Sequence, residues 1–548
     1  MPLQKNQVLT LRVERLSSDG SGVAHSPDGE TVFIPGAAPG DEARVRIVKD
    51  CKRYAFGILD EVLTPSPDRI PVDCAVAGPG GGCSLRHLDY AAELRAKQEN
   101  VADAFARIGG LDVPVLPIVG SPEVNRYRNK VQFPVGVDKS GKPCIGFYAG
   151  RTHRIVPCPD CRLQPGVLNE IGNALCAFFA EKGIQPYSEE TGRGLVRHIF
   201  LRRGAHSGQI MVCLVCTRAK LPYAEELCTR LKAQFAEITT ILLNVNAKNT
   251  NVILGTETHT LYGQGYIEDT LCGVPVQLGP LSFYQVNTLA AEQLYGIAAQ
   301  YAQLTPDDLL LDLYCGMGTI GLSMAAHCRE LIGVEIVPEA IESAKANAAR
   351  MGADVAAKSR FFCADAGQAA TRLAAEGLHP DIVMLDPPRK GCDEATLSAV
   401  VRMAPRRVVY VSCNPATAAR DAAWLEQNGY HAEKVQPVDL FPRTRHCEAV
   451  LLLTKLNVER HIEVDVSMDE LDVTAAESKA TYNEIQDYVW EHHQLKVSNL
   501  YIAQVKQKYG IIERENYHKA KNENTKQPQC PKEKEDAIVD ALRHFQMI

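Results

Sequence analysis

From Thr288 onward the sequence alternates short apolar runs with segments of helical character, and this alternation constrains the fold more than any other feature. The apolar runs are LLLDLYCG, ELIGVE, DIVMLDPP, RRVVYVSCNP and AVLLLTK. Strands that alternate with helices form a parallel sheet that is covered on both faces. The sequence therefore predicts an α/β domain with a doubly wound parallel sheet over residues 288–456.

A glycine-rich loop follows the first of these predicted strands. Gly316, Gly318 and Gly321 of CGMGTIG precede a helix, and Glu335 ends the next strand, nineteen positions after Gly316. Glycines let the backbone approach a nucleoside closely, and a carboxylate at the second strand's end can accept hydrogen bonds from ribose hydroxyls. The pattern suits a nicotinamide dinucleotide or S-adenosylmethionine, and the spacing alone does not choose between them.

Two later strand ends bear on that choice. One predicted strand runs into Asp386 of LDPPRKG and the next into Cys413 of SCNP. Ligands of open parallel sheets bind at the carboxyl ends of the strands, so both side chains should open into the crevice of the glycine loop. A hydride-transfer enzyme needs neither. The alternatives are that Asp386 begins a rigid turn and that Cys413 is an ordinary buried thiol.

The segment FPRTRHCE precedes the final predicted strand. Glu448 could reach the same crevice as a base, and His446 could orient Glu448 or hold a substrate. Taken alone, the segment is a charged loop. Together, the glycine loop, the two strand ends and this segment would provide a nucleophile, a base and a site for a nucleoside cofactor.

The motifs LDLYCGMGTIGL, LDPPRKG, VSCNPATAARD and FPRTRHCE, in this order, resemble those of the RNA uracil-5-methyltransferase family. SFYQVNT, residues 282–288, resembles a further motif of that family, and the resemblance runs from the amino terminus to about Leu456. It implies a Rossmann-like domain that uses S-adenosylmethionine, with Cys413 as nucleophile and Glu448 as general base. The candidate cofactor-binding residues are Gln285, Tyr314, Gly316, Gly318, Glu335, Asp365 and Asp386.

The chemistry of uracil explains why such an enzyme needs these residue types. Carbon 5 is a poor nucleophile, and addition of a thiolate to carbon 6 converts the ring to an enolate whose carbon 5 can attack a methyl group. A base then removes the proton from carbon 5, and the thiol is expelled. Because both groups must reach one base, the uridine should be flipped out of any helix, and an RNA loop is the expected substrate.

The amino-terminal residues 1–63 alternate with the period of a strand. Leu9, Leu11 and Val13 share one face, and glycines at 20, 22, 29, 36 and 40 separate the apolar runs, as in a small antiparallel barrel. This barrel is similar to the TRAM domain, which in the family assists RNA binding; such barrels also occur without that role. Residues 121–220 carry 15 lysines and arginines against 7 acidic residues, so the central region 64–287 could face phosphates. Its helical run from Tyr90 to Ile108 ends at Gly109-Gly110 and is expected to pack on the catalytic domain.

Many relatives carry an iron–sulfur cluster on the pattern Cys-x5-Cys-Gly-Gly-Cys with a fourth cysteine much later. Here Cys74, Cys83 and Cys161 match three of these positions, Gly80 stands at the usual second position, and Cys158 is the nearest substitute. Such clusters normally take four ligands. A [4Fe–4S] cluster, zinc and no metal all remain open.

The family pattern stops after Leu456. Residues 456–548 carry 12 basic and 17 acidic residues, and the stretch 459–477 has the composition of a solvated linker. Apolar residues at helical spacing predict helices over 482–493 and 498–509, with Ser498 as a cap. Two short helices resemble a helix-turn-helix, a form that more often mediates packing than DNA reading, and the role of this extension is open.

A chain of 548 residues is expected to form three or four modules. The first residues do not show the basic flank and apolar core of a signal peptide, and no run of about 20 apolar residues occurs that could span a membrane. A cytoplasmic protein is therefore expected. In that compartment its 18 cysteines should be free thiols, metal ligands or catalytic groups. We expect a monomeric enzyme that methylates carbon 5 of a uridine in structured RNA, 23S ribosomal RNA by analogy of its modules. The alternatives are transfer RNA as substrate, an RNA-binding protein with a vestigial site, and methylation of an exocyclic amine.

Overall fold

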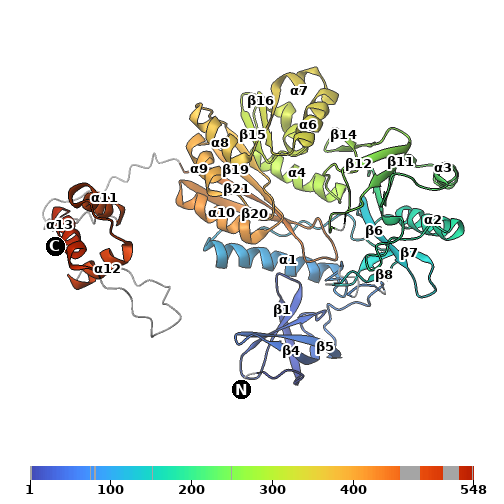
Figure 1. The fold of residues 1–548 in the computed structure, drawn as a ribbon, viewed down its shortest axis with the longest axis horizontal. Coiled ribbons are helices and arrows are strands. Elements are labelled where there is room, and N and C mark those ends of the chain that lie inside the picture. Colours follow the sequence, from blue (N-terminus) through green and yellow to red (C-terminus); the bar gives the residue numbers. More distant parts are fainter. Residues whose placement is uncertain are drawn as a thin grey trace. The chain divides into compact units, whose positions relative to one another are not determined.

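A computed structural model describes residues 3–74, 76–78, 82–150, 152–248, 250–456, 482–509, 530–545 and 547. The chain forms two compact units, Met1–Asn457 and Val458–Ile548, which are described separately. The first unit contains a small barrel, a central seven-stranded sheet and a second seven-stranded sheet (Figure 1). The predicted fold class is confirmed.

The barrel closes in the order β1-β2-β3-β5-β4. Its strands are β1 (Val8–Leu16), β2 (Ser21–His25), β3 (Thr31–Pro35), β4 (Glu42–Asp50) and β5 (Tyr54–Thr64). The predicted alternation holds, since Leu11, Val13 and Val45 are buried inside, whereas Arg44 pairs outside with Glu61 at 2.7 Å. Gly22 differs from the prediction: it lies within β2, where a Cβ atom would come within 2.9 Å of Val13. Gly22 therefore allows β2 to pack closely against Val13, and it does not form a turn.

Helix α1 (Tyr90–Ala104) begins at Asp89, whose side chain accepts a hydrogen bond from the backbone N–H of Ala92. It continues as a π-helical turn, η1 (Phe105–Gly109), and ends at Gly110, which has a left-handed φ of 63°. The helix contacts α10 and β20 of the second sheet. The amino-terminal part of the chain is thereby joined to the domain that carries the predicted site.

The central sheet has the strand order β12-β11-β10-β9-β6-β7-β8, and only the β10–β11 pair among its strand pairs is parallel. Helices α2 (Gly166–Lys182) and α3 (Ala224–Gln234) share its hydrophobic core. The strands are β6 (Lys130–Val137), β7 (Pro143–Tyr148), β8 (Ile155–Pro157), β9 (Val196–Arg203), β10 (Ile210–Cys216), β11 (Ile238–Val245) and β12 (Glu257–Tyr262). A hairpin of β13 (Ile267–Leu271) and β14 (Val274–Leu278) leads on to the second sheet.

The second sheet has the order β17-β16-β15-β18-β19-β21-β20, and its first five strands are parallel as predicted. They are β15 (Leu309–Leu313), β16 (Glu330–Glu335), β17 (Ser359–Cys363), β18 (Ile382–Leu385) and β19 (Arg407–Ser412). The predicted apolar runs did not include β17 or β20 (Tyr430–Val438), and β21 (Glu448–Lys455) runs antiparallel to both its neighbours. This reversal brings the amino-terminal end of β21 to the carboxyl ends of the parallel strands.

Helices cover both faces of this sheet (Figure 1). Alternate residues of β15 point to opposite faces, so that Leu310 packs with α4, α5 and α6, whereas Leu309 and Leu311 pack with α8, α9 and α10. The helices are α4 (Thr288–Ala302), α5 (Thr319–Met324), α6 (Pro338–Met351), α7 (Ala353–Lys358), α8 (Ala366–Ala375), α9 (Glu394–Met403) and α10 (Pro415–Gln427). Both faces are therefore buried, as a parallel sheet requires.

The second unit contains α11 (Tyr482–His493), α12 (Asn499–Lys508) and α13 (Lys532–His544). The two predicted helices are confirmed. Ser498 caps α12 as predicted, because its side chain accepts a hydrogen bond from the N–H of Tyr501. The sequence did not predict α13, whose Ile538 and Leu542 complete the apolar core with Ile485 and Val489. The predicted linker 459–477 lies outside the described residues. Across the part of the chain that is described, no helix combines the length and apolarity needed to cross a bilayer.

Candidate active site

The carboxyl end of β15 forms a tight glycine loop. Tyr314, Gly316 and Gly318 all have left-handed backbone, with φ of 65°, 55° and 78°. The conformation is ordinary for glycine but costly for Tyr314, and such strain is typical of functional loops. The N–H of Gly316 donates to Glu335 Oε2 at 3.2 Å. The ends of β15 and β16 thus meet, with the predicted ribose-binding carboxylate beside the loop.

Asp312 is a buried carboxyl in β15 that the sequence analysis did not single out. Its Oδ2 accepts a hydrogen bond from the N–H of Gly321 at 3.0 Å, whereas its Oδ1 has no partner among the described residues. Burial raises its pKa to about 8, and the nearby carboxyls of Asp386 and Glu335 contribute to the rise. A Cβ atom on Gly321 would lie 2.8 Å from Asp312 Oδ2, so this glycine is needed for the close approach. The signal in the sequence was an aspartate inside the apolar run LLLDL.

The remaining cofactor candidates lie around the same edge of the sheet. The Gln285 side chain contacts the Tyr295 hydroxyl, which also lies 3.3 Å from Thr319 Oγ1 at the start of α5. The Tyr314 hydroxyl lies 3.4 Å from Thr396 Oγ1. Asp365 follows β17 and caps α8 by accepting the N–H of Gln368 at 3.1 Å.

These residues fit S-adenosylmethionine. The loop leaves room for a close ligand because a Cβ atom on Gly316 would meet nothing within 4 Å, and Asp312 Oδ1 is a buried acceptor without a partner among the described residues. Glu335 lies where a carboxylate can hold ribose hydroxyls.

Cys413 and Glu448 face one another across neighbouring strands. Ser412 of β19 pairs with Ala449 of β21, so the antiparallel register places Cys413 next to Glu448. Burial raises the Cys413 pKa, the carboxylates of Glu448 and Asp386 raise it further, and the Arg389 guanidinium opposes them. Burial also raises the pKa of Glu448 to about 8 and of Asp386 to about 7. A thiol, a guanidinium and two carboxyls therefore lie close together at this edge of the sheet.

The loop before α10 is tied to the loop that carries Arg389. Asn414 Nδ2 donates to the Arg389 carbonyl at 2.9 Å, and Thr417 Oγ1 donates to the same oxygen at 3.3 Å. Asn414 also caps α10 by accepting the N–H of Ala416. Arg389 was visible in LDPPRKG, but its sequence spacing gave it no role. The structure brings it to Cys413, where a cation favours the thiolate.

His446 belongs to the loop that joins β20 to β21. Its ring packs edge-on against Phe441 at 6.0 Å between centroids, and its backbone N–H donates to Thr444 Oγ1. Burial lowers its pKa to about 4, and Arg389 and Arg445 contribute to the fall. Among the described residues its ring makes no hydrogen bond with Glu448, so the predicted orienting role stays a prediction.

The candidate metal ligands lie near one another in the fold. Cys83 packs against a buried cluster that contains Cys158 and Cys161, and Cys74 is close enough to raise the Cys83 pKa. A hydrogen bond from Cys158 lowers the pKa of the Cys161 thiol. Within the described ranges, no group of three or more histidine, cysteine or acidic residues is arranged to hold a metal ion. Gly80 lies outside the described residues, and the structure does not support the predicted [4Fe–4S] cluster.

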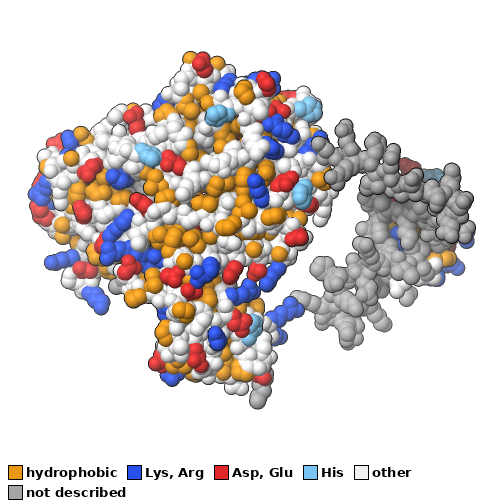
Figure 2. All heavy atoms as spheres, turned by 180° about the vertical axis from the view of Figure 1, so that it is seen from behind, with side chains coloured by type: hydrophobic (Ala, Val, Ile, Leu, Met, Phe, Trp, Pro, Cys, Tyr) orange, Lys and Arg blue, Asp and Glu red, His pale blue; other side chains and the backbone are white. Residues whose placement is uncertain are grey.

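Charge on the surface is mixed. On the face drawn in Figure 2, lysine and arginine side chains of the described residues lie among acidic ones.

The sheet order, with the antiparallel β21 beside five parallel strands, and the glycine loop are those of a class I S-adenosylmethionine-dependent methyltransferase. Comparison with known sequences narrows this class. Residues 205–456 match the tRNA (uracil-5-)-methyltransferase family, and residues 2–59 match the TRAM domain.

An RNA methyltransferase of Halalkalibacterium halodurans, described as uncharacterized, is 43% identical over 457 residues, which are 83% of this chain and 99% of that protein. A second, of Clostridium tetani, is 40% identical over 83% of this chain and 98% of that protein. The crystal structure of the Pyrococcus abyssi tRNA (uracil-54, C5)-methyltransferase in complex with S-adenosyl-L-homocysteine has a TM-score of 0.65 and 27% identity, and it covers 81% of this chain and all of that one. The chain belongs to the RNA uracil-5-methyltransferase family and is an S-adenosylmethionine-dependent enzyme.

Proposed function

We propose that the enzyme methylates carbon 5 of a uridine in structured RNA through a covalent bond between Cys413 and the base, and that its substrate is 23S ribosomal RNA. The observation that carries the mechanism is the register of β19 and β21, which places Cys413 beside Glu448. Arg389 at the thiol supplies the cation that a thiolate nucleophile needs. An exocyclic-amine methyltransferase would need neither the thiol nor the base.

The chain's own residues act before and after methyl transfer. The Cys413 thiol releases its proton to solvent and its thiolate adds to carbon 6, so the ring becomes an enolate with electron density at carbon 5, and the thiol regains a proton when it is expelled. When bound, S-adenosylmethionine would be held by Glu335, Asp386 and the glycine loop, and it would supply the methyl group to that carbon and leave as S-adenosylhomocysteine. Glu448 in its carboxylate form then takes the proton from carbon 5, the electron pair restores the double bond, and the bond to sulfur breaks. The net change replaces hydrogen by methyl and releases one proton.

Transfer RNA is the second candidate substrate. The Pyrococcus abyssi neighbour is a transfer-RNA enzyme by its description, and its likeness extends over 81% of this chain, well beyond the second sheet. The barrel and central sheet therefore do not separate the two substrates. We also propose that the enzyme is a cytoplasmic monomer. Its domain boundaries are proposed to lie near residues 63, 287 and 456.

Mapping of 5-methyluridine tests the proposal. RNA from a strain that lacks the gene is incubated with purified enzyme and labelled cofactor, and the products are digested and sequenced by mass spectrometry. Label in 23S ribosomal RNA alone supports the proposal, and label in transfer RNA alone replaces its substrate. No 5-methyluridine in either RNA contradicts the assigned reaction.

The iron–sulfur cluster stays a prediction of the family resemblance, and no step above passes through it. Iron and acid-labile sulfide in anaerobically purified protein measure it directly, with Cys161→Ser as the variant and Cys176→Ser as the control thiol. A four-iron cluster normally needs four ligands, so Cys161→Ser should lose iron and sulfide whereas Cys176→Ser should not. Less than about half an equivalent of cluster in the wild type contradicts the prediction.

A further inference from the structure

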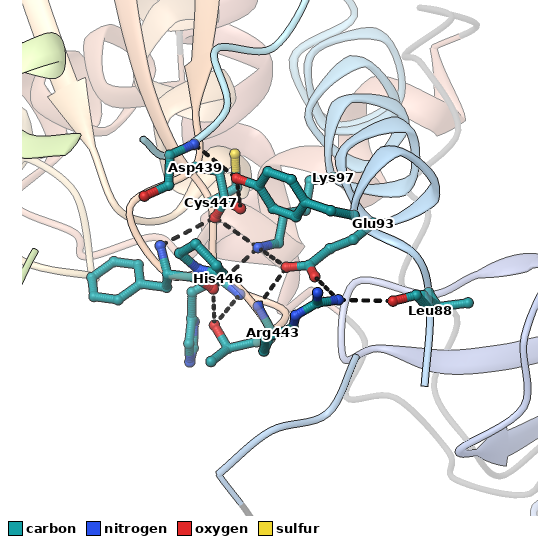
Figure 3. A network of polar contacts seen from close by, with 12 residues as sticks. Leu88, Glu93, Lys97, Asp439, Arg443, His446 and Cys447 are labelled. Carbon is teal, nitrogen blue, oxygen red and sulfur yellow. Dashed lines mark hydrogen bonds and ion pairs between the residues drawn. The ribbon is translucent and has the colours of Figure 1, made fainter. Parts of the chain in front are cut away.

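A buried lysine joins helix α1 to the loop that ends at the proposed base. Lys97 Nζ donates to Glu93 Oε1 and to Asp439 Oδ1, both at 2.7 Å, and to the Phe441 carbonyl at 3.1 Å (Figure 3). The side chains of Lys97, Glu93 and Asp439 are at most 1% exposed. All three N–H donors of the ammonium are therefore used, and two of the three bonds go to the loop.

Glu93 extends the network to the middle of the loop. Its Oε1 accepts the backbone N–H of Arg443 at 2.7 Å, and Arg443 Nη1 donates to the Leu88 carbonyl at 2.8 Å. Arg443 has a φ of 69°, in the left-handed region that non-glycine residues rarely adopt. A residue in that conformation persists only when its surroundings hold it, and here Glu93 holds its backbone directly.

Asp439 fixes the beginning of the loop. It follows β20 directly, and its Oδ2 accepts the Tyr90 hydroxyl at 3.0 Å while its Oδ1 accepts the N–H of Phe441 at 3.1 Å. The Tyr90 hydroxyl accepts in turn from the N–H of Ser121 at 2.7 Å. At its other end, the loop runs directly into Glu448, the first residue of β21.

Burial of three charged groups is a poor way to gain stability, because desolvation offsets their attraction and apolar residues of similar size often do as well. The contacts of this cluster are instead concentrated on one functional loop. Its members come from α1 and from residues 439–443, which lie more than 340 positions apart in the chain. The geometry points to a device that fixes a loop conformation.

We propose that Lys97 is a positioning residue that holds the loop 439–447 so that Glu448 can take the proton from carbon 5. The inference rests on the proposed function, because it needs Glu448 as the base. Cys413 and the cofactor residues lie at other strand ends, so the earlier steps do not depend on this loop. Loss of Lys97 should therefore slow the last step selectively.

Lys97→Met tests this because methionine keeps the length of the side chain and removes its charge. Purified full-length enzyme is incubated with RNA and labelled cofactor, and released 5-methyluridine and covalent protein–RNA adduct are measured separately. We expect the release of 5-methyluridine to fall at least ~10-fold, as for a misplaced base. Methylated adduct should accumulate, and the affinity for the cofactor should stay within about twofold of the wild-type value. Lys345→Met, at an exposed ion pair with Glu342 on α6, is the control.

A purely structural role would lower adduct and release together, since it reduces only the amount of active enzyme. That result overturns the inference, as does normal release by Lys97→Met. Because two unpaired carboxylates could prevent folding, the variant Lys97→Met/Glu93→Gln/Asp439→Asn removes all three charges together. Adduct accumulation by this folded variant supports positioning, and normal release by it refutes positioning. If the wild type forms neither 5-methyluridine nor adduct, the proposed function itself fails.

Discussion

Glu448→Gln should make the protein more stable at alkaline pH while it destroys the base. Burial raises the pKa of Glu448 to about 8 from an ordinary value of 4.5, the Asp386 carboxylate contributes to the rise, and Arg389 opposes it. Below about pH 4.5 both folded and unfolded chains keep this proton. Between that pH and about 8, only the folded chain keeps it, so the wild type loses stability as pH rises.

The magnitude follows from the shift. A difference of about 3.5 pKa units corresponds to a loss on the order of 4–5 kcal/mol by pH 8.5. Glutamine cannot ionise and avoids this loss. For cooperative unfolding of Met1–Asn457, an entropy of roughly 1 kcal/mol per degree converts it to a melting temperature higher by about 4–5 °C in the variant.

Calorimetry at pH 5 and pH 8.5 measures the effect, and the difference between the two conditions removes contributions that variant and wild type share. The exposed Glu339→Gln on α6 is the matched control and should show no change between the conditions. Equal melting temperatures of Glu448→Gln and wild type at pH 8.5 would refute the reasoning, because Glu448 would then ionise in the folded protein as easily as in water.

Three further predictions concern cofactor, nucleophile and RNA. Glu335→Ala should weaken S-adenosylmethionine binding at least tenfold, since a charge-assisted hydrogen bond contributes about 1.5–3 kcal/mol; wild-type affinity by calorimetry contradicts the assignment. Arg389→Met should raise the Cys413 pKa because the variant lacks the cation that opposes its burial; alkylation by iodoacetamide across pH measures this, and an unshifted profile counts against that role. Lys52 and Arg53 lie beside the three-ring cluster of Phe33, Tyr54 and Phe56 on the barrel. Replacing both by alanine should reduce the slope of log binding constant against log salt concentration by about one for each phosphate that is no longer neutralised. An unchanged slope excludes the two residues from the RNA interface.

The sequence predicted the parts of the site that local pattern determines. The glycine loop, Glu335, Asp386 and Cys413 each follow an apolar run, and the carboxyl ends of parallel strands meet at one edge. Strand β20 was missed because YHAEKVQPV carries charged residues at its outer positions, and β17 was missed because SRFFC is only five residues long. Its omission also hid the reversal of β21, which is what brings Glu448 to Cys413.

Other features depend on pairings that no local pattern records. Nothing in ELRAKQEN separates a buried Lys97 from a solvated one, because its partner Asp439 lies on another strand end. Helix α13 begins with KEKED, so its charge masked the apolar spacing of Ile538 and Leu542. Asp312 could have been found, since a carboxyl within a buried strand needs a reason.

Trapping with 5-fluorouridine tests the central claim most directly. Fluorine cannot leave carbon 5 as a cation, so Glu448 has no proton to remove and the adduct cannot resolve. RNA substituted with 5-fluorouridine should therefore yield, with wild-type enzyme and cofactor, a methylated protein–RNA species that survives denaturing electrophoresis and maps by mass spectrometry to Cys413. The Cys413→Ala variant should yield none. Absence of the species with wild-type enzyme that is active on unmodified RNA, or its attachment to another residue, would contradict the account.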